Sequence, residues 1–431
     1  MTLTLRDYQH RALDDLRDQL RAARRRILLL APTGSGKTVI ASSIVHGAQD
    51  RGRRVLFLAH RKELIDQCSR KLDAIGVDHG VMQGDHPRRR PWLPVQVASV
   101  QTLIRREMPW SPDLIIIDEA HRAVAASYQE ICAAHPQAIV IGLTATPVRS
   151  DGKGLGNQFD VMVSCPSVAE MIRRGYLVPI RAWTHPAPNL NGVRKVAGDY
   201  DLGELAVRMN KTAIIGDLVT TWRRHAANRQ TVVFAVNVEH SKAITQQFNA
   251  AGVRAEHLDG TTPERERDAI LARLAAGETR VVSNCAVLTE GWDCPITSCV
   301  IIARPTMSAG LYLQMAGRAL RPHPASGKRD CIVLDHGGCI RQHGLVDADR
   351  EWSLETGCAM LRSSGPRISL ADTFRVCPDC YAVHLPEAKA CPCGYTFSAR
   401  RQPIRQDAQQ SLAEVHPAEI PLPPSESQRR R

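Results

Sequence analysis

The feature that most constrains the fold is a glycine-rich loop between a predicted strand and a predicted helix, ILLLAPTGSGKTVIASSIV at Ile27–Val45. Backbone N–H groups of such a loop point at phosphate oxygens, and the following helix adds the positive end of its dipole. A chance glycine-rich turn is the alternative, but the strand before the loop and the helix after it favour a phosphate site. Ala31 departs from the pattern, which usually has glycine there.

The loop and the first helical turn supply the expected nucleotide contacts: Thr33, Gly34, Ser35, Gly36, Lys37 and Thr38. Gly34 and Gly36 let the backbone approach the phosphates. We expect Lys37 to pair with the β- and γ-phosphates and the Thr38 hydroxyl to ligate Mg²⁺. ATP and Mg²⁺ are therefore the first predicted cofactors.

A second motif, LIIIDEAH at Leu114–His121, places adjacent carboxylates after an apolar strand. Ligands of α/β folds bind at the carboxyl ends of strands. We expect Asp118 to hold Mg²⁺ and Glu119 to orient and deprotonate the attacking water. An Asp-Glu pair after a strand is often only a helix start, but its position after a phosphate loop makes the catalytic interpretation more specific.

A third motif, QMAGRALRP, contains Gln314, Arg318 and Arg321. The two arginines lie three residues apart, which places them on one face of a helix. Phosphoryl transfer spreads negative charge over the γ-phosphate oxygens, and an arginine from another part of the protein can stabilise that charge. A basic turn at the surface is the alternative for arginines considered alone.

Short apolar runs alternate with helix-like stretches, as in parallel sheets built from βα units. The runs are solidly apolar, which is typical of strands buried on both faces. The expected strands of the first half are Arg26–Leu30, Val55–Ala59, Val95–Ser99, Leu114–Ile117 and Ala138–Leu143. Those of the second half are Thr231–Ala235, Ala255–Leu258, Arg280–Ser283, Cys299–Ile302 and Cys331–Leu334.

Two such series predict two α/β lobes. We place the first lobe at residues 1–165 and the second at 166–346, with a break near Pro166. After about Asp347 the strand pattern stops, and residues 347–370 are expected to form a linker. A small module follows at 371–399. The tail at 400–431 is rich in Pro, Gln, Ser and Arg, a composition typical of disorder.

The formal net charge of +12 attracts polyanions, with nucleic acid the first candidate, although ordinary surface charge explains it equally well. The start of the chain lacks an apolar signal segment, and no apolar run approaches the roughly 20 residues of a membrane span. We therefore expect a cytoplasmic protein without a membrane partner, associated with the nucleoid in a bacterial or phage setting. In that compartment the 13 cysteines do not predict a disulfide framework.

Four cysteines are clustered in CPDCYAVHLPEAKACPC, namely Cys377, Cys380, Cys391 and Cys393. Four thiolates at this separation can hold Zn²⁺ tetrahedrally, and metal binding can fold so small a module. A redox CxxC would need a strand and a helix around it, and neither is evident. The second pair is shortened to CPC, so His384 is kept as a weaker substitute ligand for Cys393.

Taken together, the ordered motifs from Leu5 to Asp335 resemble helicase superfamily 2, in the DEAH-box group of helicases and translocases. LRDYQ is similar to the adenine-recognition element, APTGSGKT to motif I, LAHRKELIDQ to motif Ia and SVQTL to motif Ib. DEAH is similar to motif II, LTATPVR to motif III, VVFAVNVEHSKAI to motif IV, LTEGWDCP to motif V and QMAGRALRP to motif VI. This resemblance implies two tandem RecA-like lobes with parallel sheets, followed here by a small zinc-ribbon-like module.

The resemblance also implies roles for individual residues. Gln9 would contact adenine, and Arg318 and Arg321 would be arginine fingers, with Gln314 organising water or phosphate. Gly291 and Asp293 of motif V would connect the nucleotide to the nucleic-acid track. His121, Thr144 and Thr146 would couple hydrolysis to lobe movement.

The motifs resemble those of DNA-directed members more than those of DEAD-box RNA helicases, and the cysteine module resembles the RadD DNA-repair family. The expected function is therefore an ATP-dependent DNA helicase or translocase in repair or recombination. The expected partners are single-stranded or branched DNA, bound without sequence preference, and single-stranded-DNA-binding or repair proteins. The alternatives are an ATP-gated recruitment factor with little unwinding, an RNA helicase, and the motor subunit of a restriction system.

Overall fold

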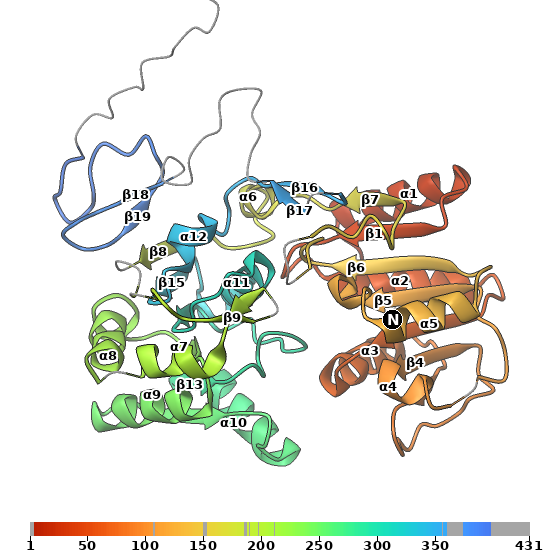
Figure 1. Cartoon of the computed structure of the whole chain (residues 1–431), viewed down its shortest axis with the longest axis horizontal. Helices are drawn as coiled ribbons and strands as arrows, with labels where there is room; N and C mark the ends of the chain where they lie inside the picture. The colour runs from red at the N-terminus through yellow and green to blue at the C-terminus, as the bar shows by residue number, and fades with distance from the viewer. Residues whose placement is uncertain are drawn as a thin grey trace, which may run out of the picture.

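The computed structural model describes residues 4–106, 108–149, 153–184, 188, 190–196, 198–210, 212–355, 357–359 and 374–397. The predicted tail at 400–431 and half of the predicted 347–370 linker lie outside these residues. Two parallel sheets dominate the described part, one in each lobe, and the lobes lie side by side (Figure 1). The predicted fold class is confirmed.

The first lobe is a seven-stranded parallel sheet in the order β3-β4-β2-β5-β6-β1-β7. Its strands are β1 (Arg26–Leu30), β2 (Val55–Ala59), β3 (Gly80–Met82), β4 (Val95–Ser99), β5 (Leu114–Asp118), β6 (Ile139–Thr144) and β7 (Val161–Ser164). Nearly every residue of the central strands is buried, because helices cover both faces of the sheet. Its helices are α1 (Asp7–Arg21), α2 (Lys37–Gln49), α3 (Lys62–Ala74), α4 (Val100–Leu103), the 3₁₀ turn η1 (Ala120–Arg122) and α5 (Ala126–Ala134).

The second lobe is a six-stranded parallel sheet in the order β12-β13-β11-β14-β15-β8. Its strands are β8 (Ile180–Thr184), β11 (Thr231–Phe234), β12 (Ala255–Leu258), β13 (Val281–Asn284), β14 (Cys299–Ile302) and β15 (Cys331–Asp335). Its helices are α7 (Leu202–Met209), α8 (Thr212–Ala226), α9 (Val238–Ala250), α10 (Glu264–Ala276), α11 (Ala309–Ala316) and α12 (Cys339–His343), with 3₁₀ turns η2 (Gly317–Ala319) and η3 (Pro324–Ser326). A small hairpin, β9 (Lys195–Val196) and β10 (Asp199–Tyr200), stands outside the sheet.

Helix α6 (Val168–Arg173) lies between the last strand of the first sheet, β7, and the edge strand of the second, β8. After α12 the chain forms another hairpin, β16 (Glu351–Ser353) and β17 (Gly357–Ala359), beside the first lobe (Figure 1). Among the described residues no helix combines the length and apolar character that crossing a membrane requires.

The cysteine module packs against the second lobe. It contains the hairpin β18 (Arg375–Val376) and β19 (Val383–His384), and a second turn closed by a bridge between Ala390 and Thr396. The module covers the open edge of β8, where Trp183 bridges to Ala382 and the Thr184 N–H donates to the Tyr381 carbonyl at 3.1 Å. It therefore sits at the β8 end of the second sheet, far from β12 and β13.

Several strands differ from the sequence expectation. Strands β3, β7 and β8 were not predicted, because β3 is very short and β8 is an edge strand whose Arg181 is exposed. The expectation that strands stop after about Asp347 was wrong, since β16, β17 and the module hairpin lie beyond it. These late strands are two or three residues long and have no apolar run to mark them.

Candidate nucleotide site between the lobes

The phosphate loop joins β1 to α2 and depends on two glycines with left-handed backbone. Gly34 has φ of 89° and Gly36 has φ of 81°, a region that side-chain-bearing residues rarely adopt. A Cβ atom on Gly36 would lie 2.7 Å from Gln9 Nε2, and one on Gly34 would lie 2.9 Å from Leu177 Cδ2. The loop is therefore a close-fitting backbone cradle at the start of a 13-residue helix, as a phosphate site requires.

The structure places Gln9 beneath this loop. Its side chain is buried, with Nε2 donating to the Ser35 carbonyl at 3.0 Å and Oε1 accepting from the Arg6 N–H at 2.9 Å. Tyr8 donates its hydroxyl to the same Ser35 carbonyl at 2.7 Å, a contact that the sequence did not reveal. Both side chains brace the loop from α1, and the predicted contact of Gln9 with adenine stays a prediction.

The adjacent carboxylates lie where β5 ends, next to the lysine of the phosphate loop. Glu119 has φ of 50°, unusual for a residue with a side chain, and this turns its carboxylate toward Lys37. Lys37 Nζ lies 3.0 Å from Glu119 Oε1, and both side chains are largely buried. The lysine of the phosphate loop and the predicted base therefore share one pocket.

Burial and the neighbouring Glu119 raise the pKa of Asp118 to about 7. Burial acts the same way on Glu119, but the charge of Lys37 and a hydrogen bond from His121 outweigh it, so the pKa of Glu119 lies well below its usual range. Strongly perturbed carboxyl groups in a cleft are typical of functional sites. Asp118 and Thr38 offer the oxygen ligands that Mg²⁺ prefers.

Three predicted coupling residues form a chain beside Glu119. His121 Nδ1 lies 3.3 Å from Glu119 Oε2 and 3.4 Å from Thr144 Oγ1, and Thr144 donates to the Thr146 carbonyl at 2.7 Å. A Cβ atom on Gly310 of the second lobe would lie 2.8 Å from Thr146 Oγ1. This polar chain therefore reaches from the carboxylates to the opposite lobe.

The second lobe brings its motif VI residues to the same place. Gln314 of α11 donates from Nε2 to Glu119 Oε2 at 3.3 Å, across the gap between lobes. Arg318 donates to the Trp292 carbonyl at 2.7 Å. Burial lowers the pKa of Arg318, while the charges of Glu119 and Glu290 act to raise it.

Arg321 lies against the phosphate loop itself. Its Cγ atom is 3.6 Å from the position a Cβ atom would take on Gly34, and its guanidinium forms an ion pair with Asp293. Gly291 of the same segment packs against α3, where an added Cβ atom would lie 3.0 Å from the Glu63 Cβ. The predicted ATP-site residues from both lobes are thus gathered in one interface.

Glu290, a carboxylate of the second lobe, is almost fully buried between the lobes and was not predicted from the sequence. It lies 2.9 Å from His60 Nε2, 3.2 Å from Arg61 Nε and 3.2 Å from Arg122 Nη2, all from the first lobe. Burial would raise its pKa, but the His60 hydrogen bond and the two arginines lower the pKa to about 2. Its position just before Gly291 was the available signal.

A groove of about 1350 Å³ opens next to Glu290, between α3 and α10. Its charged lining is mixed, with Lys62, Arg70, Lys71, Arg88, Arg90 and Arg267 against Glu63, Asp66, Asp73, Glu264, Asp268, Glu290 and Asp293. Lys62 pairs with Glu264 at 2.6 Å, and Arg267 pairs with Glu63. Ion pairs between the lobes therefore cross the groove. A polyanion would have to compete with these pairs to enter it.

The four predicted zinc ligands converge in the C-terminal module. The sulfur atoms of Cys377, Cys380, Cys391 and Cys393 all lie within 4.8 Å of one another. Zn–S bonds of about 2.3 Å in a tetrahedron separate sulfur atoms by roughly 3.8 Å, so the cluster has the size of a zinc site. Cys393 belongs to the set despite the shortened CPC, and His384 Nε2 lies 3.2 Å from the Cys391 sulfur, as a hydrogen-bonding neighbour would.

We expect about one zinc ion per purified chain, because four converging thiolates without a metal would repel one another once ionised. Cys391→Ser should lose most of the metal and expose the β8 edge to proteolysis. Cys285→Ser, a cysteine in the second lobe away from the cluster, should keep it. Metal analysis of the three proteins checks this expectation, and an unmodified chain without zinc would contradict it.

Comparisons with known proteins agree with the site. Residues 2–149 match the family described as the type III restriction enzyme res subunit, and residues 210–323 match the helicase conserved C-terminal domain. The fold and the site thus define a nucleic-acid-dependent ATPase of the helicase class. The chain belongs to helicase superfamily 2.

Among its relatives is a 51.5 kDa protein of a Lactococcus phage (isolate 7-9), 31% identical over 92% of this chain and 84% of the phage protein. A Saccharomyces cerevisiae protein named for ATP-dependent helicase activity, IRC3, is 33% identical over 80% of this chain. The chain spans only 53% of that yeast protein. A solved fragment described as an HsdR subunit of a type I restriction enzyme from Vibrio vulnificus YJ016 has the same fold, with a TM-score of 0.64 and 23% identity over 79% of this chain and 65% of the fragment.

Proposed function

We propose that this chain is a DNA-dependent ATPase that uses ATP hydrolysis between its lobes to translocate on or unwind DNA. The observation that carries the proposal is the contact of Gln314 and Arg321 of the second lobe with the first-lobe site. A site assembled from both lobes can bind and release its γ-phosphate only if the lobes move relative to each other. That movement is the mechanical step of a motor.

The chain offers a complete set of groups for ATP and Mg²⁺. The loop N–H groups and Lys37 would hold the phosphates, and Thr38 and Asp118 would hold the metal, which supplies charge neutralisation on the phosphate oxygens. Lys37 is now paired with Glu119. Phosphate would draw the lysine away and leave the Glu119 carboxylate free to orient and deprotonate water.

Coupling between the nucleotide and the nucleic acid would run through residues that already bridge the lobes. His121, Thr144 and Thr146 form the polar chain beside Glu119. Asp293 holds Arg321, and Gly291 touches α3. A change of nucleotide state would therefore move the segment after β13 and the start of α3, where motifs V and Ia lie.

We propose DNA rather than RNA as the substrate because the motifs resemble those of DNA-directed motors. The relatives support this: one, 24% identical over 74% of this chain, is named a DNA 3'-5' translocase, and another is a type I restriction endonuclease subunit. Contacts would be mainly with phosphates, which predicts little sequence preference and a strong dependence on salt.

We further propose that the process served is DNA repair or recombination, with single-stranded or branched DNA as the ligand and single-stranded-DNA-binding or repair proteins as partners. The zinc module beside the second lobe supports this, through its resemblance to the RadD family. A cytoplasmic location with access to the nucleoid fits this role. The second candidate is the motor subunit of a restriction system, favoured by the restriction-enzyme relatives.

A strand-displacement assay, run beside an ATPase assay on the same samples, tests the motor proposal. We expect ATP-dependent displacement of a labelled oligonucleotide from forked DNA, and less from the matched RNA fork. ATP hydrolysis stimulated by DNA without displacement or translocation would instead support a recruitment factor. Faster displacement of RNA would reverse the substrate assignment.

A further inference from the structure

Two connections between the lobes lie within the described residues, at the same end of the molecule. The first crossing follows β7 and contains α6, and the second follows α12 and leads to β16. Figure 1 shows α6 and the β16–β17 hairpin close together beside the gap between lobes. We call residues 346–354 of the second crossing the strap.

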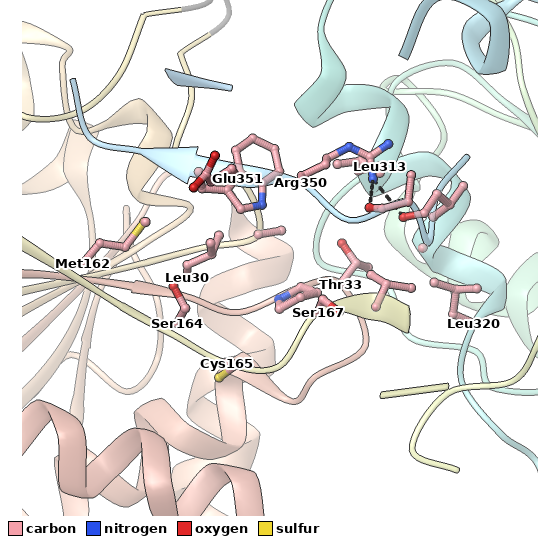
Figure 2. Close-up of a pocket in the computed structure, with 17 residues that line it drawn as sticks. Leu30, Thr33, Met162, Ser164, Cys165, Ser167, Leu313, Leu320, Arg350 and Glu351 are labelled. Carbon is pink, nitrogen blue, oxygen red and sulfur yellow. Dashed lines mark hydrogen bonds between the residues drawn. The ribbon is translucent and has the colours of Figure 1, made fainter. Parts of the chain in front are cut away.

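One end of the strap is fixed to the second lobe by Arg350. Its guanidinium donates to the His343 and Leu345 carbonyls, which precede the strap, at 3.0 and 2.7 Å. It also donates to two carbonyls at the start of the strap, those of Val346 and Ala348, at 3.1 and 3.0 Å. These carbonyls belong to the last residue of α12 and the turn after it, which no helical N–H can satisfy. Figure 2 shows the labelled Arg350 side chain with dashed bonds to two of these oxygens.

The other end is fixed to the first lobe by Leu354. Its carbonyl accepts from the Gly156 N–H at 2.8 Å, and its side chain packs on the apolar cluster that contains Leu155 and Phe159. A Cβ atom on Gly154 would lie 1.9 Å from the Leu354 carbonyl oxygen, so this contact requires glycine. Each anchor thus rests on specific hydrogen bonds, and the two anchors belong to different lobes.

A cavity of about 250 Å³ lies between the two crossings. Thr33 of the phosphate loop, Gly317 and Leu320 of motif VI, Cys165 of the first crossing and Trp352 of the strap all line it (Figure 2). A Cβ atom on Gly317 would lie 2.5 Å from the Thr33 Cβ, so the loop and motif VI meet at this cavity without room for a side chain. The strap therefore covers the point where the two halves of the ATP site join.

The strap is also short. Leu354 follows Arg350 by four Cα-to-Cα steps, and an extended chain spans at most about 3.5 Å per step, or roughly 14 Å between these Cα atoms. While both anchors hold, the lobes cannot separate beyond that reach at this end. Opening must then occur as rotation about this end, with the larger displacement at α3 and α10.

We propose that the strap is a positioning element, which holds Arg318 and Arg321 in place beside the phosphate loop before ATP binds. The proposal rests on the proposed ATPase function and names Arg350 and Leu354 as positioning residues. Without the strap, only a fraction of molecules would hold the closed arrangement, and the apparent affinity for ATP would fall by that fraction. Saturating ATP would still close the lobes, so the maximal rate would survive.

The test lengthens the strap without removing either anchor, by inserting Gly-Ser-Gly-Ser after Arg350. The same insertion after Gly52, in an exposed turn of the first lobe, is the matched control. We expect the strap insertion to raise KM for ATP about tenfold and to change kcat by less than about twofold. Leu354→Asp, which removes the apolar packing of the lobe-1 anchor but keeps its backbone hydrogen bond, should act in the same direction.

A second measurement does not depend on turnover. Fluorescence energy transfer between labels at the exposed positions Glu130 and Arg265 reports the distance between the lobes without nucleotide. The strap insertion should broaden that distance distribution, and the Gly52 control should not. Unchanged KM and unchanged distances would overturn the proposal. A broadened distance distribution in a chain that hydrolyses no ATP would support the role of the strap and contradict the proposed ATPase function instead.

Discussion

Replacing Glu119 by glutamine is expected to reduce the maximal rate of ATP hydrolysis by about 10³-fold while leaving ATP binding intact. The amide keeps the shape of the side chain but cannot take a proton from water. Lys37, now paired with the carboxylate, would lose that partner and remain free for phosphate. Steady-state turnover and equilibrium binding of a fluorescent ATP analogue measure the two effects separately.

The matched control is Glu130→Gln, an exposed glutamate of α5 in the same lobe, which should leave turnover unchanged. Loss of nucleotide binding in Glu119→Gln would point to a structural role for the carboxylate. Normal turnover would refute the assignment of the base.

Replacing Arg318 by alanine is expected to lower kcat by about 10³-fold, the usual scale for an arginine that stabilises the transferring phosphate. Arg318 donates to the Trp292 carbonyl on the lobe opposite the phosphate loop, and the charge of Glu119 acts to raise its pKa. Its loss should affect the rate more than ATP binding, because the charge it stabilises develops only during transfer. Single-turnover hydrolysis in preformed ATP complexes measures this rate directly.

Arg265→Ala, at an exposed position on α10, is the control and should behave as the unmodified chain. An Arg318 variant with normal single-turnover rates would remove this side chain from the reaction. Arg321 would then be left as the candidate, because it lies against Gly34 of the phosphate loop.

The central strands could be predicted because burial on both faces leaves only apolar residues in them, as in β2 and β5. The edge strands β7 and β8 include half-buried and exposed residues and lack this signal. Strand β8 has the exposed Arg181, and its partner along the open edge is the cysteine module rather than solvent. Strap residues 347–354 fall in the predicted linker because the anchors bond to backbone groups, and backbone groups carry no sequence pattern.

The residues of the candidate site also fall into those that the sequence predicts and those that it does not. Residues within a motif, such as Lys37 and Glu119, were predicted because loop and strand chemistry is local. Gln314 was expected to organise water or phosphate only through the resemblance, and its contact with Glu119 was not predicted, since no pattern connects residues so far apart. Glu290 was missed because its importance depends on His60, Arg61 and Arg122, which reach it only after both lobes have folded.

The most direct test of the central claim is the rate of ATP hydrolysis by the full chain with single-stranded DNA, duplex DNA, forked DNA and matched RNA. A composite ATPase coupled to DNA predicts a low basal rate, strong stimulation by single-stranded or forked DNA, weaker stimulation by RNA, and no turnover in Lys37→Ala. A rate that does not respond to any nucleic acid, or that persists in Lys37→Ala, would contradict it.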